Sequence, residues 1–265
     1  MLALAALALL LACALFAGVL APHGPAEQFR DALLSPPALD SGYILGTDEL
    51  GRDLLSRLLF GARFTLGIAG LAVLLAVLPG VALGLVAAFH PRVLGTAILR
   101  AADVLLVLPS VLTAVAVVAV LGPGFFNTVL ALSLSALPGY VRLVRASALG
   151  ELAKPYVLGA RAVGASTGRL MFITVLPNCL GPVIVSATLD FSSVILSVAG
   201  LGFLGLGAQP PAPEWGNMLA SARDFIGRAN WIVLSPGLAI LLTVLCVNLV
   251  GDALRDGLDP RQVSR

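Results

Sequence analysis

The sequence predicts an all-α integral membrane protein, with six transmembrane helices forming a single domain over residues 1–265. Two observations support this fold class. Hydrophobic residues make up 59% of the chain and charged residues only 11%, with a mean hydropathy of +1.02, whereas soluble domains carry roughly 25% charged residues. Several stretches also lack any charge over the length of about 20 residues that a bilayer-crossing helix needs. We therefore set a water-soluble fold aside.

The first half of the chain supplies four of the predicted spans. Residues 2–21 carry no charge; a cleaved signal peptide is the alternative, but the run lacks a basic start and is long for a signal, so we expect a retained span. The second span covers residues 64–89. Residues 104–141 are uncharged and too long for one crossing, and Gly122-Pro123-Gly124 is a turn signal near their middle. This pattern predicts a helical hairpin with spans at 99–121 and 125–144.

The last two spans are expected at residues 174–201 and 229–251. Lysine and arginine are enriched in cytoplasmic loops of membrane proteins. With the amino terminus inside, the inner segments hold ten of these residues, Arg261 and Arg265 among them, and the outer segments hold six. We therefore expect a cytoplasmic amino terminus. The net charge of only +2 and the scattered arginines exclude a nucleic-acid partner.

The first informative polar segment, on the predicted outer side, is an outer-face motif of Gly46, Thr47, Asp48, Gly51, Arg52 and Asp53. Thr47 suits a helix N-cap, with Asp48 near the positive end of the helix dipole. Leu50, Leu54 and Leu58 follow at helical spacing. This pattern predicts a helix lying at the outer interface before the second span. The alternative is that the segment only anchors that span.

The second polar segment, residues 151–177, lies on the predicted inner side. Pro155 suits the first position of a short helix, and Gly164 suits its end, with Arg161 in the last turn. Ser166 suits the N-cap of a second helix that runs into the next span. Two short helices joined at a glycine would form a projecting elbow, whose apolar and basic surface indicates docking of a partner protein. An ordinary loop is the alternative.

A third polar segment, rich in glycine and proline, covers residues 203–216 on the outer side, where Trp215 and Trp231 are expected as interface anchors. The two histidines and the three cysteines are isolated, so we predict no metal site.

Asp190 is the one acid well inside a span. Intramembrane carboxylates usually mark a transport pathway or an internal pair. We predict that Asp190 and Ser193 lie on a translocation pathway; a local bond from Asp190 to a serine or to a neighbouring helix is the alternative. Asp103 follows Arg100 by three residues, and we expect these two to pair.

Several short groups of residues follow one another in a specific combination. They are Gly46-Thr47-Asp48, Leu50-Gly51-Arg52-Asp53, Ser56-Arg57, Gly61-Ala62-Arg63, Ala160-Arg161-Ala162, Gly164-Ala165-Ser166, Leu176-Pro177-Asn178, Phe203 to Pro211, Trp215-Gly216-Asn217-Met218-Leu219 and Gly251-Asp252-Ala253-Leu254-Arg255-Asp256. With them the chain resembles, from about residue 43 to residue 261, the second permease subunit of the dipeptide, oligopeptide and nickel family of binding-protein-dependent ABC importers. The resemblance implies the type I ABC importer permease fold.

The resemblance also implies that the elbow is the cytoplasmic loop that couples the permease to its ATPase. The residues concerned are Leu158, Gly159, Ala160, Arg161, Gly164, Ala165, Ser166, Arg169, Leu176 and Pro177. The family pattern begins with Glu-Ala-Ala, whereas this chain has Leu158 and Gly159 in the first two places. The missing carboxylate puts an acid-dependent contact to the ATPase in question, though not the elbow itself.

The expected assembly is an importer in the cytoplasmic membrane of a prokaryote. A homologous permease would form a heterodimer with this chain, two ATP-binding subunits would dock inside, and an extracytoplasmic substrate-binding protein would deliver di- or oligopeptides. ATP and Mg²⁺ would be used by the ATPase partners, because a phosphate-binding loop needs Gly-Lys-Ser/Thr and the single lysine, Lys154, precedes a proline. We expect neither enzymatic activity nor a bound cofactor on this chain.

Two other classes are weighed against this interpretation. A secondary transporter or channel subunit that is not driven by ATP predicts several intramembrane charges or broken helices in paired halves, whereas Asp190 is nearly alone. An intramembrane hydrolase would need a catalytic pair within the spans, and both histidines lie outside them.

Overall fold

The computed structural model describes residues 2–40 and 42–258, and these confirm the all-α class. The helices are α1 (Leu2–Leu15), α2 (Ala17–Leu20), α3 (Leu54–Phe89), α4 (Val93–Leu106), α5 (Ser110–Leu121), α6 (Phe125–Leu152), α7 (Pro155–Ala162), α8 (Thr167–Arg169), α9 (Leu176–Phe203), α10 (Trp215–Ala222) and α11 (Asn230–Leu258). Short 3₁₀ turns cover Arg30–Ala32 and Arg223–Phe225, and a π-helical turn, Leu170–Val175, joins α8 to α9.

Within the described residues, four helical segments are long and apolar enough to cross a membrane: α3, α6, the continuous run Thr167–Phe203 and α11. These correspond to the predicted spans at 64–89, 125–144, 174–201 and 229–251, and each extends beyond the predicted range at one end or both. The first predicted span, 2–21, is a 14-residue helix and a 4-residue helix separated at Phe16, which is shorter than a usual crossing.

The segment predicted as a span at 99–121 consists of two helices, which pass the length and hydropathy criteria for a span only when taken together. α4 and α5 are separated by residues 107–109 and bent by 89° relative to each other. Pro109 explains the break, because proline has no amide hydrogen to donate and disfavours helical geometry at the residue before it. Pro109 serves instead as the N-cap of α5. The turn predicted at Gly122-Pro123-Gly124 is confirmed between α5 and α6, where Gly122 and Gly124 have positive φ angles.

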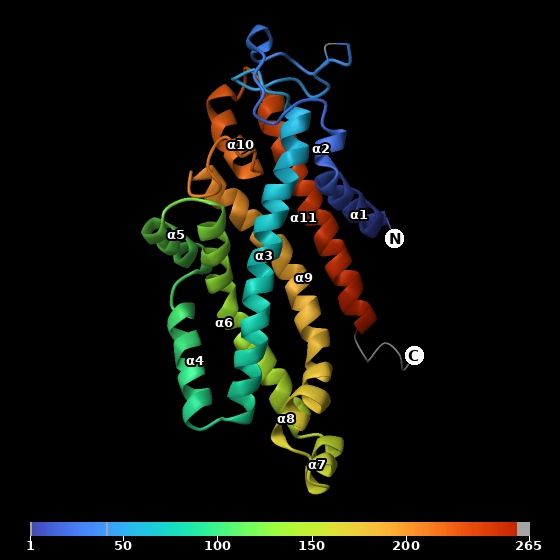
Figure 1. Ribbon diagram of the computed structural model, residues 1–265, viewed down its shortest axis with the longest axis vertical. Coiled ribbons are helices and arrows are strands. Elements are labelled where there is room, and N and C mark those ends of the chain that lie inside the picture. The colour runs from blue at the N-terminus through green and yellow to red at the C-terminus, as the bar shows by residue number, and fades with distance from the viewer. Residues whose placement is uncertain (1, 41, 259–265) are drawn as a thin grey trace.

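The long helices α3, α6, α9 and α11 run side by side along the long axis of the molecule (Figure 1). α3 and α6 approach closely because glycines face the neighbouring helix. A Cβ atom on Gly80 would lie 2.5 Å from Cβ of Tyr140, and one on Gly84 would lie 2.8 Å from the carbonyl oxygen of Val141. Small residues at such contacts are the usual means by which helices associate in lipid.

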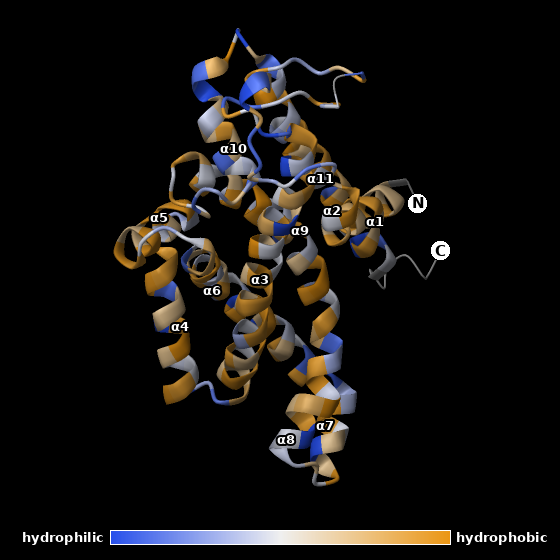
Figure 2. Cartoon of the chain, turned by 45° about the horizontal axis from the view of Figure 1, so that its top comes forward, coloured by the Kyte–Doolittle hydropathy of each residue, from blue (hydrophilic) through white to orange (hydrophobic). Residues whose placement is uncertain are grey.

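The polar segments lie at the two ends of the bundle, with an apolar band between them (Figure 2). The loop of residues 22–53 and α10 lie at one end, and α7 and α8 lie at the other (Figure 1). The sequence placed these segments on opposite sides of the membrane, and their positions agree with that arrangement. The charges of Arg261 and Arg265 lie outside the described residues.

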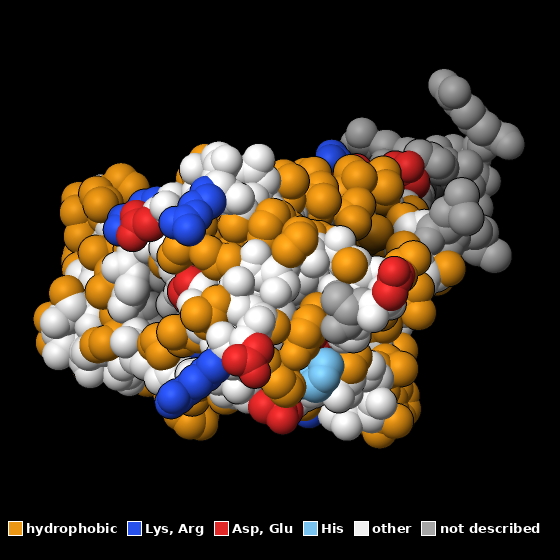
Figure 3. Space-filling model, turned by 90° about the horizontal axis from the view of Figure 1, so that it is seen from above, with side chains coloured by type: hydrophobic (Ala, Val, Ile, Leu, Met, Phe, Trp, Pro, Cys, Tyr) orange, Lys and Arg blue, Asp and Glu red, His pale blue; other side chains and the backbone are white. Residues whose placement is uncertain are grey.

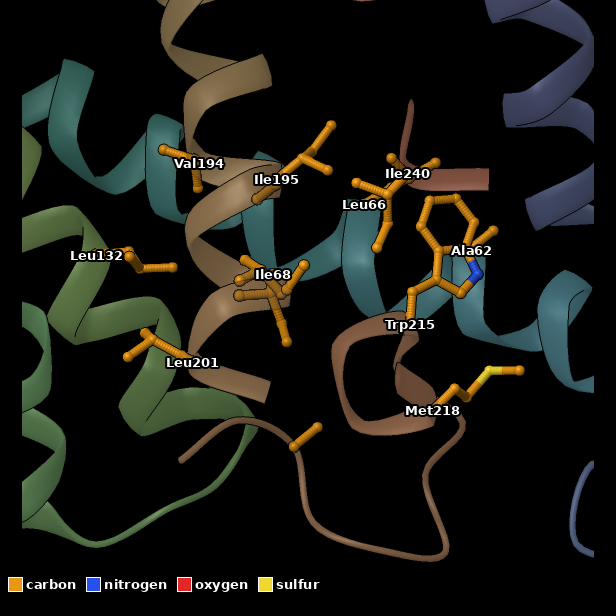
Figure 4. Packing of buried hydrophobic residues seen from close by; sticks show 14 of the residues in the cluster. Ala62, Leu66, Ile68, Leu132, Val194, Ile195, Leu201, Trp215, Met218 and Ile240 are labelled. Atoms are coloured by element: carbon orange, nitrogen blue, oxygen red, sulfur yellow. The ribbon is translucent and has the colours of Figure 1, made fainter. Parts of the chain in front are cut away.

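Two hydrophobic clusters form the core. The upper cluster joins α3, α6, α9, α10 and α11 and contains Ile68, Leu132, Ile195, Trp215 and Ile240 (Figure 4). The lower cluster, nearer the elbow, joins α3, α6, α7 and α9 through Leu85, Val144, Ala148, Val157, Leu170, Met171, Val175, Cys179 and Val183. α3, α6 and α9 contribute to both, so these three helices connect the outer end of the molecule to the elbow.

The expectation that Trp215 anchors the membrane interface is wrong. Its side chain is 2% exposed, and its indole nitrogen donates to the carbonyl oxygen of Leu58 at 3.1 Å. Gly61 makes room for the ring, since a Cβ atom there would lie 2.7 Å from Cδ1 of the indole. Trp215 therefore packs α10 against the first turns of α3.

Candidate functional site

The outer-face motif is a buried ionic cluster rather than an exposed surface. Asp48 is 2% exposed, and its Oδ2 accepts from Nε of Arg52 at 2.7 Å and lies 3.3 Å from Nε of Arg57. Its Oδ1 accepts from the backbone nitrogens of Leu50 and Arg52, both at 2.9 Å. Two arginines thus share one carboxylate, which also accepts hydrogen bonds from the loop backbone. Removing any one of these buried charges would leave another without its partner, which is energetically costly.

Asp53, and not Thr47, caps the following helix. Oδ2 of Asp53 accepts from the backbone nitrogen of Ser56 at 3.0 Å, and α3 begins directly after it at Leu54. The predicted interfacial helix is therefore absent as a separate element: these residues start one continuous 36-residue helix. Leu54, expected on an interfacial face, is 1% exposed and belongs to the upper cluster.

Thr47 instead holds the loop of residues 22–53 together. Its hydroxyl donates to the carbonyl oxygen of Ala32 and accepts from the backbone nitrogen of Ser35, and its own carbonyl accepts from the indole nitrogen of Trp231 at 3.2 Å. Gly51 has a φ of +73°, and a Cβ atom there would lie 2.1 Å from the carbonyl oxygen of Phe29. The motif therefore fixes the loop against α3 and α11. Seen from this end, acidic and basic side chains lie among apolar ones (Figure 3).

Glu214 links three helices, α3, α9 and α10. Its carboxylate is fully buried and accepts from the backbone nitrogens of Gly216 at 2.7 Å and Asn217 at 2.9 Å, which caps α10, and from the Thr65 hydroxyl of α3 at 3.3 Å. Gly202 of α9 packs so closely that a Cβ atom there would lie 2.1 Å from Oε2 of Glu214. The sequence analysis did not assign Glu214 a role. Its position directly before Trp215-Gly216-Asn217, where an acid can cap a short helix, could have indicated one.

The stability of the protein is expected to fall as pH rises through the titration of Glu214. Burial raises the pKa of this carboxyl above its ordinary 4.5, against the opposing effect of its hydrogen bonds from Gly216, Asn217 and Thr65. Between the two pKa values the folded state holds a proton that the unfolded state has released, so the free energy of unfolding decreases with rising pH from about 4.5 upward.

Thermal unfolding in detergent across this pH range tests the expectation. Glu214→Gln should remove that part of the pH dependence and lower stability overall, because an amide nitrogen would face the backbone donors. Asp224→Asn, at an exposed acid of the same end, is the control and should leave the pH profile unchanged. An unchanged profile in Glu214→Gln would contradict the assignment.

The predicted elbow is confirmed in its local geometry. Pro155 is the first residue of α7, and Gly164 follows it with a φ of +86°. The nitrogen of Gly164 donates to the carbonyl of Arg161, and that of Ala165 donates to the carbonyl of Ala160, which is the Schellman pattern that ends a helix at glycine. The hydroxyl of Ser166 accepts from the nitrogen of Arg169 and so caps α8.

The two faces of α7 differ sharply. Val157 is fully buried in the lower cluster, whereas Leu158 and Val163 are 51% and 87% exposed. Tyr156 donates to Glu151 at the end of α6, which raises the pKa of the phenol to about 12 and keeps it a hydrogen-bond donor. α7 is therefore fastened to the bundle on one side and presents an apolar surface on the other.

The remaining predicted elbow residues lie around that surface. Gly159, Arg161 and Arg169 are exposed, and no acidic residue occurs between Glu151 and Asp190 in the sequence. Leu176 and Pro177 begin α9 and so connect the elbow to the next long helix. The elbow thus combines exposed apolar and cationic groups, as the sequence indicated.

Asp190 and Ser193, predicted to lie on a translocation pathway, line one cavity. The cavity has a volume of about 240 Å³ and lies between α5, α6 and α9. The expected pairing of Asp103 with Arg100 is wrong, because Asp103 forms a salt bridge with Arg142 of α6. α4 packs beside α6, which brings the distant arginine closer than the one on its own helix. Among the described residues, no group of three or more His, Cys, Asp or Glu residues is placed to hold a metal ion.

Comparison with known proteins identifies what these elements belong to. The family described as "Binding-protein-dependent transport system inner membrane component" matches residues 80–264. The chain belongs to this family. It is 59% identical over 257 residues to the di/tripeptide transport system permease protein of Pseudomonas aeruginosa (strain UCBPP-PA14), covering 96% of this chain and 85% of the relative. It is 51% identical over 252 residues to the dipeptide transport system permease protein of Escherichia coli (strain K12), covering 94% and 84%.

A third relative is the glutathione transport system permease protein of Pectobacterium atrosepticum, 41% identical over 96% of this chain and 84% of its own length. Among solved structures, a chain of the MetNI methionine ABC transporter superposes with a TM-score of 0.64 at 17% identity, covering 78% of this chain and 98% of that chain. The predicted type I permease fold is confirmed by this likeness.

The sequence motifs of this inner membrane component predicted only part of its structural contacts. Val157 carries no motif and was missed as the residue that anchors the elbow. Arg57, the second partner of Asp48, was part of a matching group without an assigned role. The break at Pro109 had a signal, a proline inside an apolar run, that went unused beside the stronger Gly122-Pro123-Gly124 turn. Membership of a binding-protein-dependent family disfavours the alternative of an ATP-independent transporter.

Proposed function

We propose that this chain is the pore-forming permease subunit of an ATP-driven importer of di- or oligopeptides. The relatives that support the substrate class are named for the transport of dipeptides, di- and tripeptides and glutathione, itself a tripeptide. The chain pairs with a homologous permease as a heterodimer in the cytoplasmic membrane of a prokaryote, with its amino terminus in the cytoplasm. An extracytoplasmic binding protein delivers the peptide to the outer end.

The observation that carries the coupling part of this proposal is the two-sided packing of α7. Val157 ties the helix into the lower cluster with α3, α6 and α9, while Leu158 and Val163 project outward. A partner protein bound to the exposed face of α7 would therefore transmit its movement to α3, α6 and α9. The two ATP-binding subunits dock here, and they bind ATP and Mg²⁺.

The mechanism that follows is alternating access. Closure of the ATPase pair on ATP shifts the elbow, and the shift rocks α3 and α9 between inward-open and outward-open arrangements. The buried cluster around Asp48 keeps the outer loop in one shape, so that the binding protein meets a fixed surface rather than a flexible one. The importer needs only weak contacts to its substrate on the way through, because binding it tightly in the pore would slow its release.

Val163→Asp is expected to weaken the attachment of the ATPase subunits about tenfold, which corresponds to about 1.4 kcal/mol of lost contact energy. The substitution places a charge on the most exposed apolar residue of the elbow. The measurement is co-purification of the ATPase subunits with the tagged permease pair from detergent-solubilised membranes, followed by ATP hydrolysis of the recovered complex.

Ile226→Asp provides the matched control. Ile226 is also apolar and 67% exposed, but it lies beyond α10 at the opposite end of the molecule. Its substitution should leave co-purification unchanged. Full recovery of ATPase subunits with Val163→Asp would contradict docking at the elbow, and equal losses in both variants would point to general destabilisation instead.

A further inference from the structure

The cavity between α5, α6 and α9 has an unusual lining for the middle of a membrane protein. Most of its wall is apolar, yet it contains Asp190 together with Ser110, Ser135, Ser193 and Ser197. Charged side chains inside a membrane are costly and persist where they serve a pathway or a partner. The polar groups come from three different helices, α5, α6 and α9, and face one cavity. The spacing of polar residues along a single helix therefore does not account for the polar lining.

Asp190 lies near the midpoint of α9, fourteen residues after Leu176 and thirteen before Phe203. At about 1.5 Å per residue it is about 20 Å from either end of α9, well inside the apolar segment Thr167–Phe203. The break between α4 and α5 borders the same cavity through Leu106 and Ser110. In secondary transporters, substrate sites likewise lie beside interrupted helices.

The carboxylate has no cationic partner within residues 2–40 and 42–258. The salt bridges there join other groups; Arg142 on the neighbouring α6, for example, is paired with Asp103. Tyr140 of α6 lies near Asp190, and a phenol cannot serve as a cationic partner. The negative charge of the cavity is therefore available to a cation from outside the chain.

The serines around Asp190 present acceptors. The hydroxyl of Ser135 donates to the carbonyl of Ala131 at 2.8 Å, and that of Ser197 donates to the carbonyl of Ser193 at 2.9 Å. With their protons directed to their own helices, these oxygens offer lone pairs to the cavity. An ammonium group has three donors and no acceptor, so its hydrogen-bonding requirements complement those of a carboxylate flanked by such hydroxyls.

We propose that this cavity binds the amino-terminal ammonium group of a peptide in transit, with Asp190 as its counter-ion and the hydroxyls of Ser135 and Ser197 as further acceptors. This inference rests on the proposed peptide importer and names the part of the substrate that the permease recognises. The volume of about 240 Å³ is below the roughly 300 Å³ at which pockets for drug-sized ligands begin. It suits one end of a short peptide rather than the whole of it.

Ligand binding to the purified complete transporter, without binding protein or nucleotide, tests the inference directly. The probes are L-alanyl-L-alanine amide, which carries only the ammonium charge, and its N-acetyl derivative, which is neutral. Saturation-transfer NMR should detect the free-amino probe and not the acetylated one. Asp190→Asn should weaken the signal about tenfold, the size of a lost charge-assisted hydrogen bond, and Asp190→Glu should retain most of it.

The control is Asp224→Asn, which removes an exposed acid at the outer end and should leave the free-amino signal as in the wild type. Equal signals from the two probes, or an unchanged signal in Asp190→Asn, would overturn the assignment.

Transport gives a second readout that separates this inference from the proposed function. In proteoliposomes, Asp190→Asn should reduce dipeptide uptake about tenfold while stimulation of ATP hydrolysis by the loaded binding protein stays near the wild-type level. Failure of the wild-type complex to import peptides would refute the proposed function, whatever the variant does. Wild-type uptake rates in Asp190→Asn would refute the ammonium site alone.

Discussion

Gly164→Trp is expected to abolish peptide uptake and the stimulation of ATP hydrolysis while the complex still assembles in the membrane. Gly164 has a φ of +86°, which L side chains rarely adopt, and no atom lies within 4 Å of the place where a Cβ would stand. The indole would therefore not disturb the core. It would project from the turn between α7 and α8 into the space that the ATPase groove is proposed to occupy, and it would also strain the Schellman turn.

Uptake of radiolabelled dipeptide by intact cells, with immunoblots of the membrane fraction, measures this effect. Wild-type uptake in Gly164→Trp would refute the coupling role of the elbow. Loss of the protein from the membrane would show instead that the turn is needed for assembly.

A pair of alanine substitutions separates backbone strain from bulk. Gly164→Ala and Gly159→Ala add the same methyl group, and both sites have nothing within 4 Å. Only Gly164 has the left-handed conformation, where alanine costs about 1–2 kcal/mol, whereas Gly159 lies inside α7, where alanine stabilises a helix by about 0.5–1 kcal/mol. Hydrogen exchange of the elbow should thus become faster in the first variant and slower in the second. The same direction in both would contradict the role of the turn.

Asp48→Ala is expected to cause the largest loss of stability, about 3–5 kcal/mol, the usual consequence of leaving a buried charge without its partner. The substitution removes the carboxylate shared by Arg52 and Arg57, which are 7% and 4% exposed. Arg52 keeps its contact with Glu49 at 3.1 Å, so the charge left without an acidic partner is that of Arg57. It also leaves the backbone nitrogen of Leu50 without its acceptor. The loop of residues 22–53 should loosen first, because these contacts fix it to α3.

Denaturant titration of the purified protein in micelles measures this loss. Asp31→Ala is the matched control, since Asp31 is an exposed acid in the same loop, and a change there should stay within about 0.5 kcal/mol. Similar stabilities for Asp48→Ala and the wild type would show that the cluster contributes no net stabilisation, as some buried ion pairs do not.

The sequence predicted those features of the fold that depend on residues close together in the chain. The apolar runs predicted the long helices, and Pro155, Gly164 and Ser166 predicted the elbow almost residue by residue, because caps and left-handed turns are decided by the few residues that form them. Asp190 and Ser193 line the same cavity because three residues on one helix separate them by about one turn; their predicted place on a translocation pathway stays a prediction.

What the sequence did not reveal depends on contacts between distant segments. The burial of Trp215 requires Gly61 on another helix, and the pairing of Asp103 with Arg142 rather than Arg100 requires α4 to pack on α6. Glu214 serves three helices at once. Hydropathy alone also favoured an unbroken span over residues 99–121, because every residue around Pro109 is compatible with lipid.

The continuous course of α3 has a mechanical consequence. At 36 residues and about 1.5 Å per residue it is about 54 Å long, and it belongs to both hydrophobic clusters. If the ATPase docks at the elbow as proposed, a tilt of α3 by about 5° about that end would displace its outer end by about 5 Å. A small rotation at the elbow would thus become a larger movement at the opposite end of the helix.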